Sequence, residues 1–246
     1  MAEYKIDINV DVGEGIAHES KLIPIISSCN IACGGHTGDE QSMREAVQLA
    51  IKYNTKIGAH PSFPDTNNFG RSIVKLSCTS LYQSIKQQIE DLHGIIREEK
   101  GILHHIKPHG ALYNLAAKDQ STAEVIVAVI KRCNQPLKLY VPYGSVIAKI
   151  AQKENVKITY EAFADRNYNE DLSLVSRAQP KALITKSDAI FAHVNYMITN
   201  HKVKTISAKE VAIKADTFCL HGDTPNALHL TRDLIKNLNA IGIKIE

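Results

Sequence analysis

Histidines and a carboxylate recur in this chain at the ends of short apolar segments. Asp11, His36, His60, His109 and His221 each end such a segment or follow it closely. Neutral imidazole and carboxylate are ligands that suit Zn, Mn, Fe or Ni, and an open coordination position lowers the pKa of a bound water toward neutrality. The same groups carry out acid–base chemistry. The sequence therefore predicts a polar site for proton transfer or for a divalent metal, with Asp11, His36, His60 and His221 as candidate ligands.

Three basic side chains lie in similar positions and could bind an anion. Lys107 ends an apolar segment and precedes a proline, which restricts the backbone and favours a defined side-chain direction. Arg71 and Arg166 offer planar guanidinium groups for bidentate binding of a carboxylate or phosphate. Each arginine could instead be structural and pair with a nearby Asp65 or Asp165.

Several other polar residues have a structural explanation. Asp39 and Asp223 each precede a predicted helix and could cap it, although this explanation is weaker for Asp223 because it lies beside a histidine. His104 and His105 are adjacent in a predicted strand, so their side chains point to opposite faces. We expect a hydrogen-bonded core histidine there rather than a ligand.

The motifs of several enzyme classes are missing. The sequence has neither a Walker phosphate-binding loop nor a GxGxxG motif after its first strand, so any ATP is bound unconventionally or elsewhere. It also lacks a GxSxG motif and a recognisable cysteine nucleophile, which leaves activated water as the better candidate nucleophile.

Composition and charge exclude further classes. The chain is 44% hydrophobic and 22% charged, which is typical of a globular protein. Its net charge is +3, and 29 basic residues are spread among 26 acidic ones, so we expect no nucleic-acid binding. The sequence has no signal segment and no apolar run of membrane-spanning length, so we expect no membrane association. The five cysteines form no CxxC pair, which is typical of a reducing compartment. Together these features predict a cytoplasmic protein. Cys29 and Cys33 lack a second pair that would complete a zinc site.

The elements that must position the polar groups alternate between strand and helix. Seven segments are predicted strands: Tyr4–Val10, Cys29–Ala32, Lys56–His60, Ile102–Lys107, Leu137–Val141, Val156–Phe163 and Thr217–His221. Five segments are predicted helices: Asp39–Tyr53, Thr79–Glu99, Thr122–Cys133, Gly144–Glu154 and Pro225–Ala240. Asp188–Asn200 is a further candidate helix and Val203–Ile206 a short candidate strand, which leaves an eighth barrel strand open.

This alternation predicts an α/β fold with a parallel sheet. The sequence has no linker, low-complexity tract or obvious repeat that would divide it, so we expect one domain over residues 1–246. This length is close to the roughly 250 residues of a β/α barrel. In such a barrel all strand ends meet at one face, where active sites are built. An open doubly wound sheet is the second architecture compatible with the pattern.

Seven motifs in this order resemble the LamB/YcsF family over almost the whole chain. They are NVDVGEG at 9–15, SSCNIACGGHTGD at 27–39, IGAHPSFPD at 57–65, FGR at 69–71, KPHGALYN at 107–114, EAFADRNY at 161–168 and CLHGDTP at 219–225. The chain departs from the family pattern at Gly35, Thr37 and Ser72, and these departures leave the polar candidates intact.

The resemblance implies a seven-stranded parallel β/α (TIM-like) barrel of the glycoside hydrolase/deacetylase type. Family members are the A subunit of bacterial ATP-dependent 5-oxoprolinase, which opens the lactam of 5-oxoproline to L-glutamate. The implied co-substrate is ATP, the implied partners are two companion subunits, and a divalent metal is a candidate cofactor.

The required chemistry suggests roles for the residues of the motifs. As hypotheses, the catalytic residues are Asp11, Glu14, His60 and Lys107. The substrate-binding residues are Asn30, Arg71, His109, Tyr113, Arg166 and Asp223.

Two other functions are compatible with the sequence. The first is a stand-alone metal-dependent deacetylase or amidohydrolase that needs neither ATP nor partners. The second is a non-catalytic subunit that captures a small carboxylate.

Overall fold

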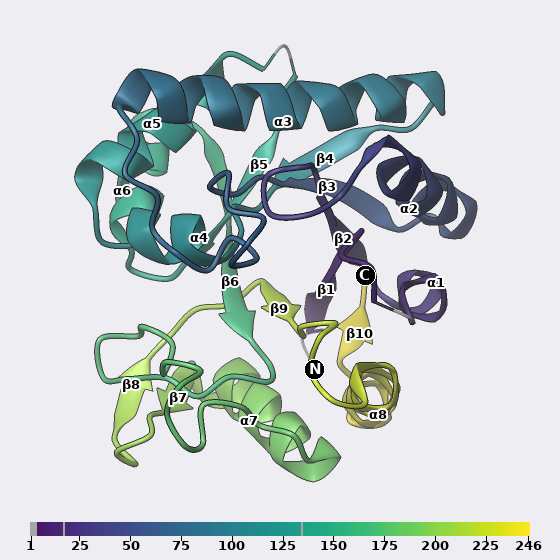
Figure 1. Ribbon diagram of the computed structural model, residues 1–246. Helices are drawn as coiled ribbons and strands as arrows, with labels where there is room; N and C mark the ends of the chain where they lie inside the picture. The colour runs from purple at the N-terminus through teal and green to yellow at the C-terminus, as the bar shows by residue number, and fades with distance from the viewer. Residues whose placement is uncertain (1–3, 17, 134) are drawn as a thin grey trace.

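Seven parallel strands close into a barrel in the computed structural model, which describes residues 4–16, 18–133 and 135–246 (Figure 1). The strands pair in the order β1-β2-β3-β4-β5-β6-β9, and β9 pairs back with β1. Their bounds are β1 (Lys5–Val12), β2 (Ser28–Ala32), β3 (Lys56–His60), β4 (Leu103–Ile106), β5 (Lys138–Pro142), β6 (Lys157–Phe163) and β9 (Thr217–Cys219). The predicted seven-stranded parallel barrel is confirmed.

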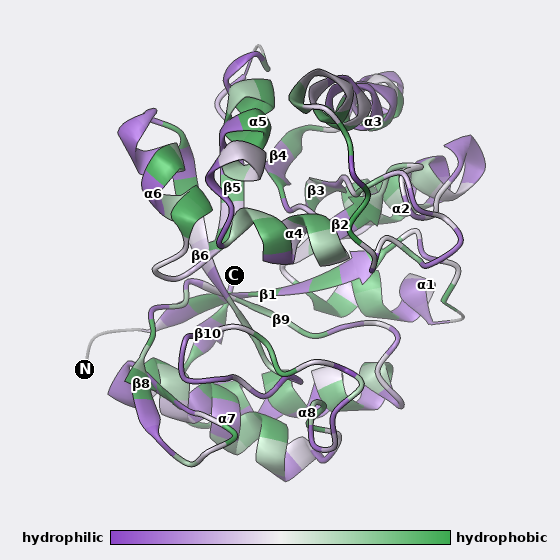
Figure 2. Ribbon diagram, turned by 60° about the vertical axis from the view of Figure 1, so that its left-hand side comes forward, coloured by the Kyte–Doolittle hydropathy of each residue, from purple (hydrophilic) through white to green (hydrophobic). Residues whose placement is uncertain are grey.

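Helices surround the barrel and cover its strands. The longer ones are α2 (Glu40–Tyr53), α3 (Cys78–Glu98), α5 (Gln120–Lys131), α6 (Val146–Lys153), α7 (Ser187–Asn200) and α8 (Ala227–Ala240). They carry hydrophobic and hydrophilic bands, as expected for helices that pack one face on a core (Figure 2). Within the described part of the chain, no helix combines the length and the apolar character needed to cross a membrane.

The predicted helices agree with the structure to within a few residues, but several short elements were not predicted. These are α1 (Glu19–Leu22), the 3-10 helix η1 (Ile23–Ile25), α4 (Gly110–Ala116), β8 (Glu210–Ala212) and β10 (Lys244–Ile245). Each is too short for hydrophobic periodicity to reveal it.

The segment after α7 does not supply an eighth barrel strand. The candidate strand Val203–Ile206 corresponds to β7 (Lys202–Lys204), which pairs antiparallel with β8 (Glu210–Ala212) in a separate ribbon. The other additional strand, β10, pairs with the start of β1.

Asp39 caps α2, as predicted. Its side chain accepts a hydrogen bond from the Ser42 amide at 2.8 Å, and the Ser42 hydroxyl contacts the Asp39 backbone N–H in return, which completes a capping box. The cap suggested for Asp223 is wrong, because α8 begins after Asn226 and Asp223 forms ion pairs instead.

The barrel interior is polar because β1 alternates between apolar and polar residues. Asp7, Asn9 and Asp11 are buried and hydrogen-bond to residues of other barrel strands, while the intervening isoleucine and valine side chains join the hydrophobic core. His105 also faces this interior, where its Nε2 donates to Asn30 at 2.8 Å. It is the satisfied core histidine that we expected.

We expect Gly58→Ala to destabilise the fold. A Cβ at Gly58 would lie 2.1 Å from Nε2 of His105, and that ring is stacked on Tyr140 at 4.0 Å and cannot retreat easily. The free energy of unfolding should fall by at least about 2 kcal/mol, measured by chemical denaturation. Gly94→Ala is the matched control, because Gly94 lies in α3 with no atom near its added Cβ; it should be neutral or stabilising by about 0.5–1 kcal/mol. Equal stability of the two variants would contradict this account.

Candidate active site

A cavity of about 550 Å³ opens at the carboxyl ends of the barrel strands. Ten of the predicted site residues line it: Asp11, Glu14, His60, Arg71, Lys107, His109, Tyr113, Arg166, His221 and Asp223. The other two, Asn30 and His36, are buried beside it and contact Asp11 and Glu14 respectively. The fold therefore gathers all the predicted candidates around one site.

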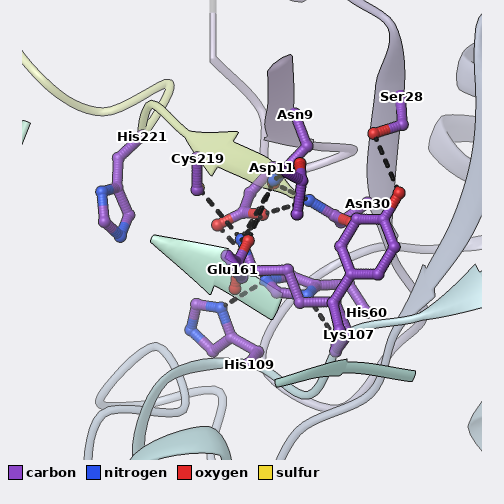
Figure 3. A network of polar contacts seen from close by, with 12 residues as sticks. Asn9, Asp11, Ser28, Asn30, His60, Lys107, His109, Glu161, Cys219 and His221 are labelled. Atoms are coloured by element: carbon purple, nitrogen blue, oxygen red, sulfur yellow. Dashed lines mark hydrogen bonds and ion pairs between the residues drawn. The ribbon is translucent and has the colours of Figure 1, made fainter. Parts of the chain in front are cut away.

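The Lys107 ammonium group lies at the centre of the polar interior (Figure 3). Only 2% of the residue is exposed, and its Nζ lies 2.9 Å from Asp11 Oδ1 and 3.1 Å from Glu161 Oε1. Nζ also contacts Asn9 Oδ1 at 3.2 Å and Cys219 Sγ at 3.0 Å. Burial disfavours the charged amine, but the two carboxylates outweigh it and raise the Lys107 pKa. Lys107 is therefore a fixed cation that organises other side chains.

Asn9 and Asn30 connect the ion pairs to the rest of the interior. The Asn9 amide donates to Glu161 at 3.0 Å and to Thr217 at 2.8 Å, and its oxygen accepts from Asn30 at 2.8 Å. Asn30 also donates to Asp11 Oδ1 at 2.8 Å. Because both hydrogen bonds from Asn30 and Lys107 end on Oδ1, the second oxygen of Asp11 is left for His60 and the cavity. Burial opposes ionisation of Asp11, but positive charge at His60 and at Lys107 lowers its pKa, so Asp11 is ionised.

The rings of His60 and His109 point one nitrogen atom each at the other, and in the neutral rings both of these nitrogens are unprotonated. His60 Nδ1 lies 2.6 Å from the Lys107 carbonyl and His109 Nε2 lies 2.9 Å from the Phe69 carbonyl. A carbonyl only accepts, so both of these nitrogens carry protons. In the neutral rings the remaining two nitrogens, which are 2.9 Å apart, are therefore both acceptors. This arrangement requires a proton or a metal cation between them.

Glu14 adds a carboxylate to this pair of histidines. Its Oε1 lies 3.1 Å from His36 Nε2 and 3.7 Å from His109 Nδ1. The loop that presents it is held by Glu19, whose carboxylate accepts from the backbone amides of Gly13 and Glu14 at 2.9 Å. Burial and the nearby Asp11 raise the pKa of Glu14, whereas burial and His60 lower the pKa of His36 to about 3.

Two glycines allow the loop after β3 to approach the start of α4. Gly70 and Gly110 both have positive φ, and the Ala111 amide donates to the Gly70 carbonyl at 2.9 Å. A Cβ on Gly110 would lie 2.7 Å from the Gly70 carbonyl oxygen. The close approach brings the Phe69 carbonyl to His109 and so fixes the orientation of that ring.

Asp165 orients the ring of His221, which also lines the cavity. Its Nδ1 lies 2.9 Å from Asp165 Oδ1, and Asp165 also accepts from the His221 amide and from Thr224. Burial opposes ionisation of Asp165, but these contacts lower its pKa, so the ionised carboxylate accepts a hydrogen bond from Nδ1–H of His221. The carboxylate thus fixes the tautomer of His221 and leaves Nε2 for the cavity.

Asp11, Cys219 and His221 also lie close enough to suggest a cation site. Lys107 Nζ, however, lies 3.0 Å from Cys219 Sγ and 2.9 Å from Asp11 Oδ1. An ammonium group in that position repels a second cation. Burial, moreover, raises the pKa of Cys219, which keeps the thiol neutral. We therefore do not assign a metal to this group.

The rim of the cavity carries arginines with different roles. Arg71 Nη2 lies 2.6 Å from Asp223 Oδ2, and Arg177 pairs with the same carboxylate. Arg166 is buried and donates to the carbonyls of Val175 and Ala182 at 2.6 and 3.4 Å. Neither Arg71 nor Arg166 forms the structural pair, with Asp65 or Asp165, that the sequence left open. The hydrogen bonds of Arg166 shape the loop between β6 and α7.

Tyr113 places a buried hydroxyl group beside Glu161. Burial and this carboxylate raise the Tyr113 pKa, so the phenol is neutral. Within the described residues, neither Tyr113 Oη nor Glu161 Oε2 has a hydrogen-bond partner of good geometry. Tyr113 therefore retains a hydrogen-bonding group for a ligand at the wall of the cavity.

Five residues of the site were not predicted as site residues: Asn9, Glu161, Asp165, Arg177 and Cys219. The period-two alternation of Asp7, Asn9 and Asp11 is a sequence signal that could have revealed a polar barrel interior. No comparable signal connects Asp165 to His221 or Arg177 to Asp223, because those pairs depend on how distant segments pack.

The chain matches a protein family over nearly its whole length, and it is similar to several solved structures. The LamB/YcsF family matches residues 6–246. The crystal structure of a lactam utilization protein from Thermus thermophilus is 36% identical, with a TM-score of 0.92 over 98% of this chain and 99% of that one.

Two more distant structures give TM-scores of 0.46. They are T48 deacetylase with substrate, 11% identical over 99% of this chain and 87% of that one, and a family 4 carbohydrate esterase from Streptomyces lividans in complex with acetate, 10% identical over 99% and 92%. These similarities are too low to inform the chemistry.

Replacing the central lysine should destabilise the protein in a pH-dependent way. Lys107→Met leaves the buried carboxylates of Asp11 and Glu161 without a counter-charge, and we expect a loss of about 3–5 kcal/mol in the free energy of unfolding. The folded-state pKa values of these carboxylates should then rise above their unfolded values. The folded variant would bind more protons than the unfolded chain, so its deficit should be larger at pH 8 than at pH 5. Denaturation at both pH values measures this.

Lys118→Met is the control for this experiment, because Lys118 lies at the cavity wall outside the buried network of ion pairs. It should change the stability by less than about 0.5 kcal/mol at either pH. A Lys107→Met deficit that is the same at pH 5 and pH 8 would show that the carboxylates are compensated by other groups.

Proposed function

This chain belongs to the LamB/YcsF family, and on that premise we propose that it is the A subunit of an ATP-dependent 5-oxoprolinase, which hydrolyses the lactam of 5-oxoproline to L-glutamate. The observation that carries the proposal is the pair of bare nitrogens on His60 and His109, placed beside the ionised Asp11 in one cavity. Such a site can activate a water molecule and polarise a carbonyl oxygen, which are the two requirements for opening an amide ring.

The donor atoms around these histidines fit a divalent cation. Donors around a tetrahedral zinc ion lie about 3.4 Å apart. His60 Nε2 is 2.9 Å from His109 Nδ1 and 3.4 Å from Asp11 Oδ2, and His109 Nδ1 is 3.7 Å from Glu14 Oε1. We propose that His60, His109 and Glu14 hold the cation, with Asp11 adjoining it. A cation bound there would supply a Lewis acid for the carbonyl oxygen and for water.

His36 is better suited to orient Glu14 than to bind the same cation. Its ring is stacked on that of His109 with centroids 3.7 Å apart and planes within 1° of parallel. Nitrogen lone pairs lie in the ring plane, and one cation cannot lie in two parallel planes. His36 Nε2 at 3.1 Å from Glu14 Oε1 can instead hold the carboxylate in place. The sequence-based assignment of Asp11, His36, His60 and His221 as ligands therefore gives way, in this proposal, to His60, His109 and Glu14.

Asp11 and His221 suit the two proton transfers of the reaction. Asp11 is held in its ionised form by Lys107 and Asn30, so its free oxygen can accept a proton from the attacking water. His221 is held by Asp165 with Nε2 facing the cavity, so the proton that Asp11 takes from the water can pass through Nε2 to the leaving amine nitrogen. The water oxygen joins the carbonyl carbon, the carbon–nitrogen bond breaks, and glutamate is released.

The lactam needs activation because an unstrained amide is a poor electrophile. Transfer of the γ-phosphoryl group of ATP to the amide oxygen would release ADP and give a phosphorylated imidate that water attacks more readily. Cleavage of the carbon–nitrogen bond then leaves an acyl phosphate, which a second water molecule hydrolyses to the carboxylate and phosphate. The described cavity supplies groups for water, carboxylate and proton transfer, and the sequence has no Walker motif. We therefore propose that the two companion subunits are required for turnover.

We expect the purified chain to bind about one divalent metal ion through His60 and His109. After dialysis against a chelator, titration calorimetry with Zn²⁺, Mn²⁺ and Ni²⁺ and elemental analysis would measure uptake. His60→Gln and His109→Gln should each weaken binding by at least about tenfold. His229→Gln is the control, because His229 is exposed on α8 and pairs with Asp233 of the same helix. Wild-type affinity in both ligand variants would mean that a proton, not a metal, bridges the pair.

The activity itself is tested by glutamate release from 5-oxoproline with ATP, using this chain alone and together with the companion subunits from the same source. We expect release only in the full mixture. Asp11→Asn should reduce turnover by at least about two orders of magnitude, because it removes the base. The variant should retain its folding, because an amide oxygen can still accept from Lys107 and Asn30; circular dichroism would verify this.

Four results would contradict this proposal. Release by the chain alone without ATP indicates an independent metal-dependent amidohydrolase, as does activity of the isolated chain on acetylated sugars. Full turnover with Asp11→Asn removes Asp11 from the mechanism. Tight binding of 5-oxoproline with dispensable Asp11, His60 and Lys107 indicates a non-catalytic binding subunit.

A further inference from the structure

Arg71, Arg177 and Asp223 form a complete carboxylate-binding arrangement at the rim of the cavity. Arg177 contacts both oxygens of Asp223, with Nη1 at 3.0 Å from Oδ2 and Nη2 at 3.2 Å from Oδ1. Arg71 Nη2 lies 2.6 Å from the same Oδ2. Two guanidinium groups thus hold one carboxylate, and Arg177 does so by the bidentate geometry that is preferred for this ion.

The two arginines are held in place by contacts that do not involve Asp223. The Arg71 guanidinium lies over the Phe69 ring at 5.0 Å, and that ring packs edge-on against His36 and His109 at 5.1 and 5.5 Å. Arg177 follows the loop segment whose Val175 carbonyl is held by Arg166 at 2.6 Å. The Arg71 guanidinium group and the loop segment that carries Arg177 should therefore keep their positions when the carboxylate between them changes.

The rim has more positive than negative charge. Arg71, Arg177, Lys118 and Arg166 line the cavity, whereas Asp223 is the negative side chain that the two rim arginines share. The Asp223 side chain is 28% exposed, so it can turn into solvent. A second anion can then take its place at little cost in electrostatic energy.

We propose that Arg71 and Arg177 form the subsite for the substrate's carboxylate, and that Asp223 occupies this subsite as an intramolecular stand-in until the substrate displaces it. This inference rests on the proposed function, which makes the substrate a small cyclic amide with a carboxylate on its ring. Phe69 links the subsite to the histidine pair, so a carboxylate bound at the rim directs the ring of the substrate toward His60 and His109. Arg177 is then a specificity-determining residue, and Arg166 a positioning residue for its loop.

Calorimetric titration with L-5-oxoproline and with its uncharged carboxamide tests the subsite. The wild-type chain should bind the acid at least about tenfold more tightly than the amide. Arg177→Met should weaken binding of the acid by about 10–100-fold and leave the amide nearly unaffected, whereas Arg177→Lys should have an intermediate effect because it keeps the charge but loses the fork. Arg132→Met, at an exposed position at the end of α5, is the matched control and should behave like the wild type.

The Asp223→Asn variant tests whether Asp223 competes with the substrate's carboxylate or has a purely structural role. If Asp223 competes with the substrate, removing its charge should tighten binding of the acid by about three- to tenfold and leave the amide unchanged. Weaker binding of both ligands would show that Asp223 is structural and would overturn the inference. Thermal unfolding of each variant confirms that the comparison is made on folded protein.

The remaining outcomes distinguish this inference from the proposed function. Equal binding of acid and amide, unaffected by Arg177→Met, overturns the subsite and leaves the lactam substrate intact. Binding of neither ligand contradicts the lactam substrate itself and the inference with it. Inorganic phosphate that binds more tightly than 5-oxoproline, and whose binding is lost in Arg177→Met, would overturn the carboxylate assignment in favour of a phosphate group.

Discussion

The buried ammonium group of Lys107 is the interaction on which the rest of the site depends. Two carboxylates, Asp11 and Glu161, lie in a barrel interior where an unpaired charge would be very unfavourable, and Lys107 contacts both at about hydrogen-bond distance. Its position also fixes the chemistry of its neighbours. One Asp11 oxygen is bound by it, so the other is directed to the histidines, and the space beside Cys219 is closed to a second cation.

A polar interior has structural requirements that a hydrophobic one lacks. Each amide and carboxylate inside the barrel needs a partner in a defined direction, which Asn9 obtains through contacts to Asn30, Glu161, Lys107 and Thr217. Hydrophobic packing on the outside of the strands supplies the stability, and the hydrogen-bond network supplies a unique arrangement. The candidate active site depends on the same order, because residues at the ends of these strands line the cavity.

The sequence predicted the barrel well because its signals are local. Seven apolar segments and the helical periodicity between them identified the strands and long helices, and the polar clusters after the strands identified the cavity. The sequence did not reveal contacts between distant segments. Asp165 is 56 residues from His221, and Glu161 is 152 residues from Asn9. The parallel stacking of His36 on His109 likewise follows from the approach of two loops, so the sequence could not separate a metal ligand from the residue that orients one.

The pairing of β1 with β9 has a consequence for how the protein is made. Asn9 and Asp7 form hydrogen bonds with Thr217, which is 208 and 210 residues away in the sequence. The first strand is synthesised long before the last barrel strand, so these hydrogen bonds cannot form until β9 has left the ribosome. Until then, the nascent chain carries an unpaired sheet edge, and Asp7 and Asn9 lack their hydrogen bonds with Thr217. The active site therefore assembles only after translation has passed β9, and a chain that ends earlier is an incomplete barrel that chaperones and proteases can recognise.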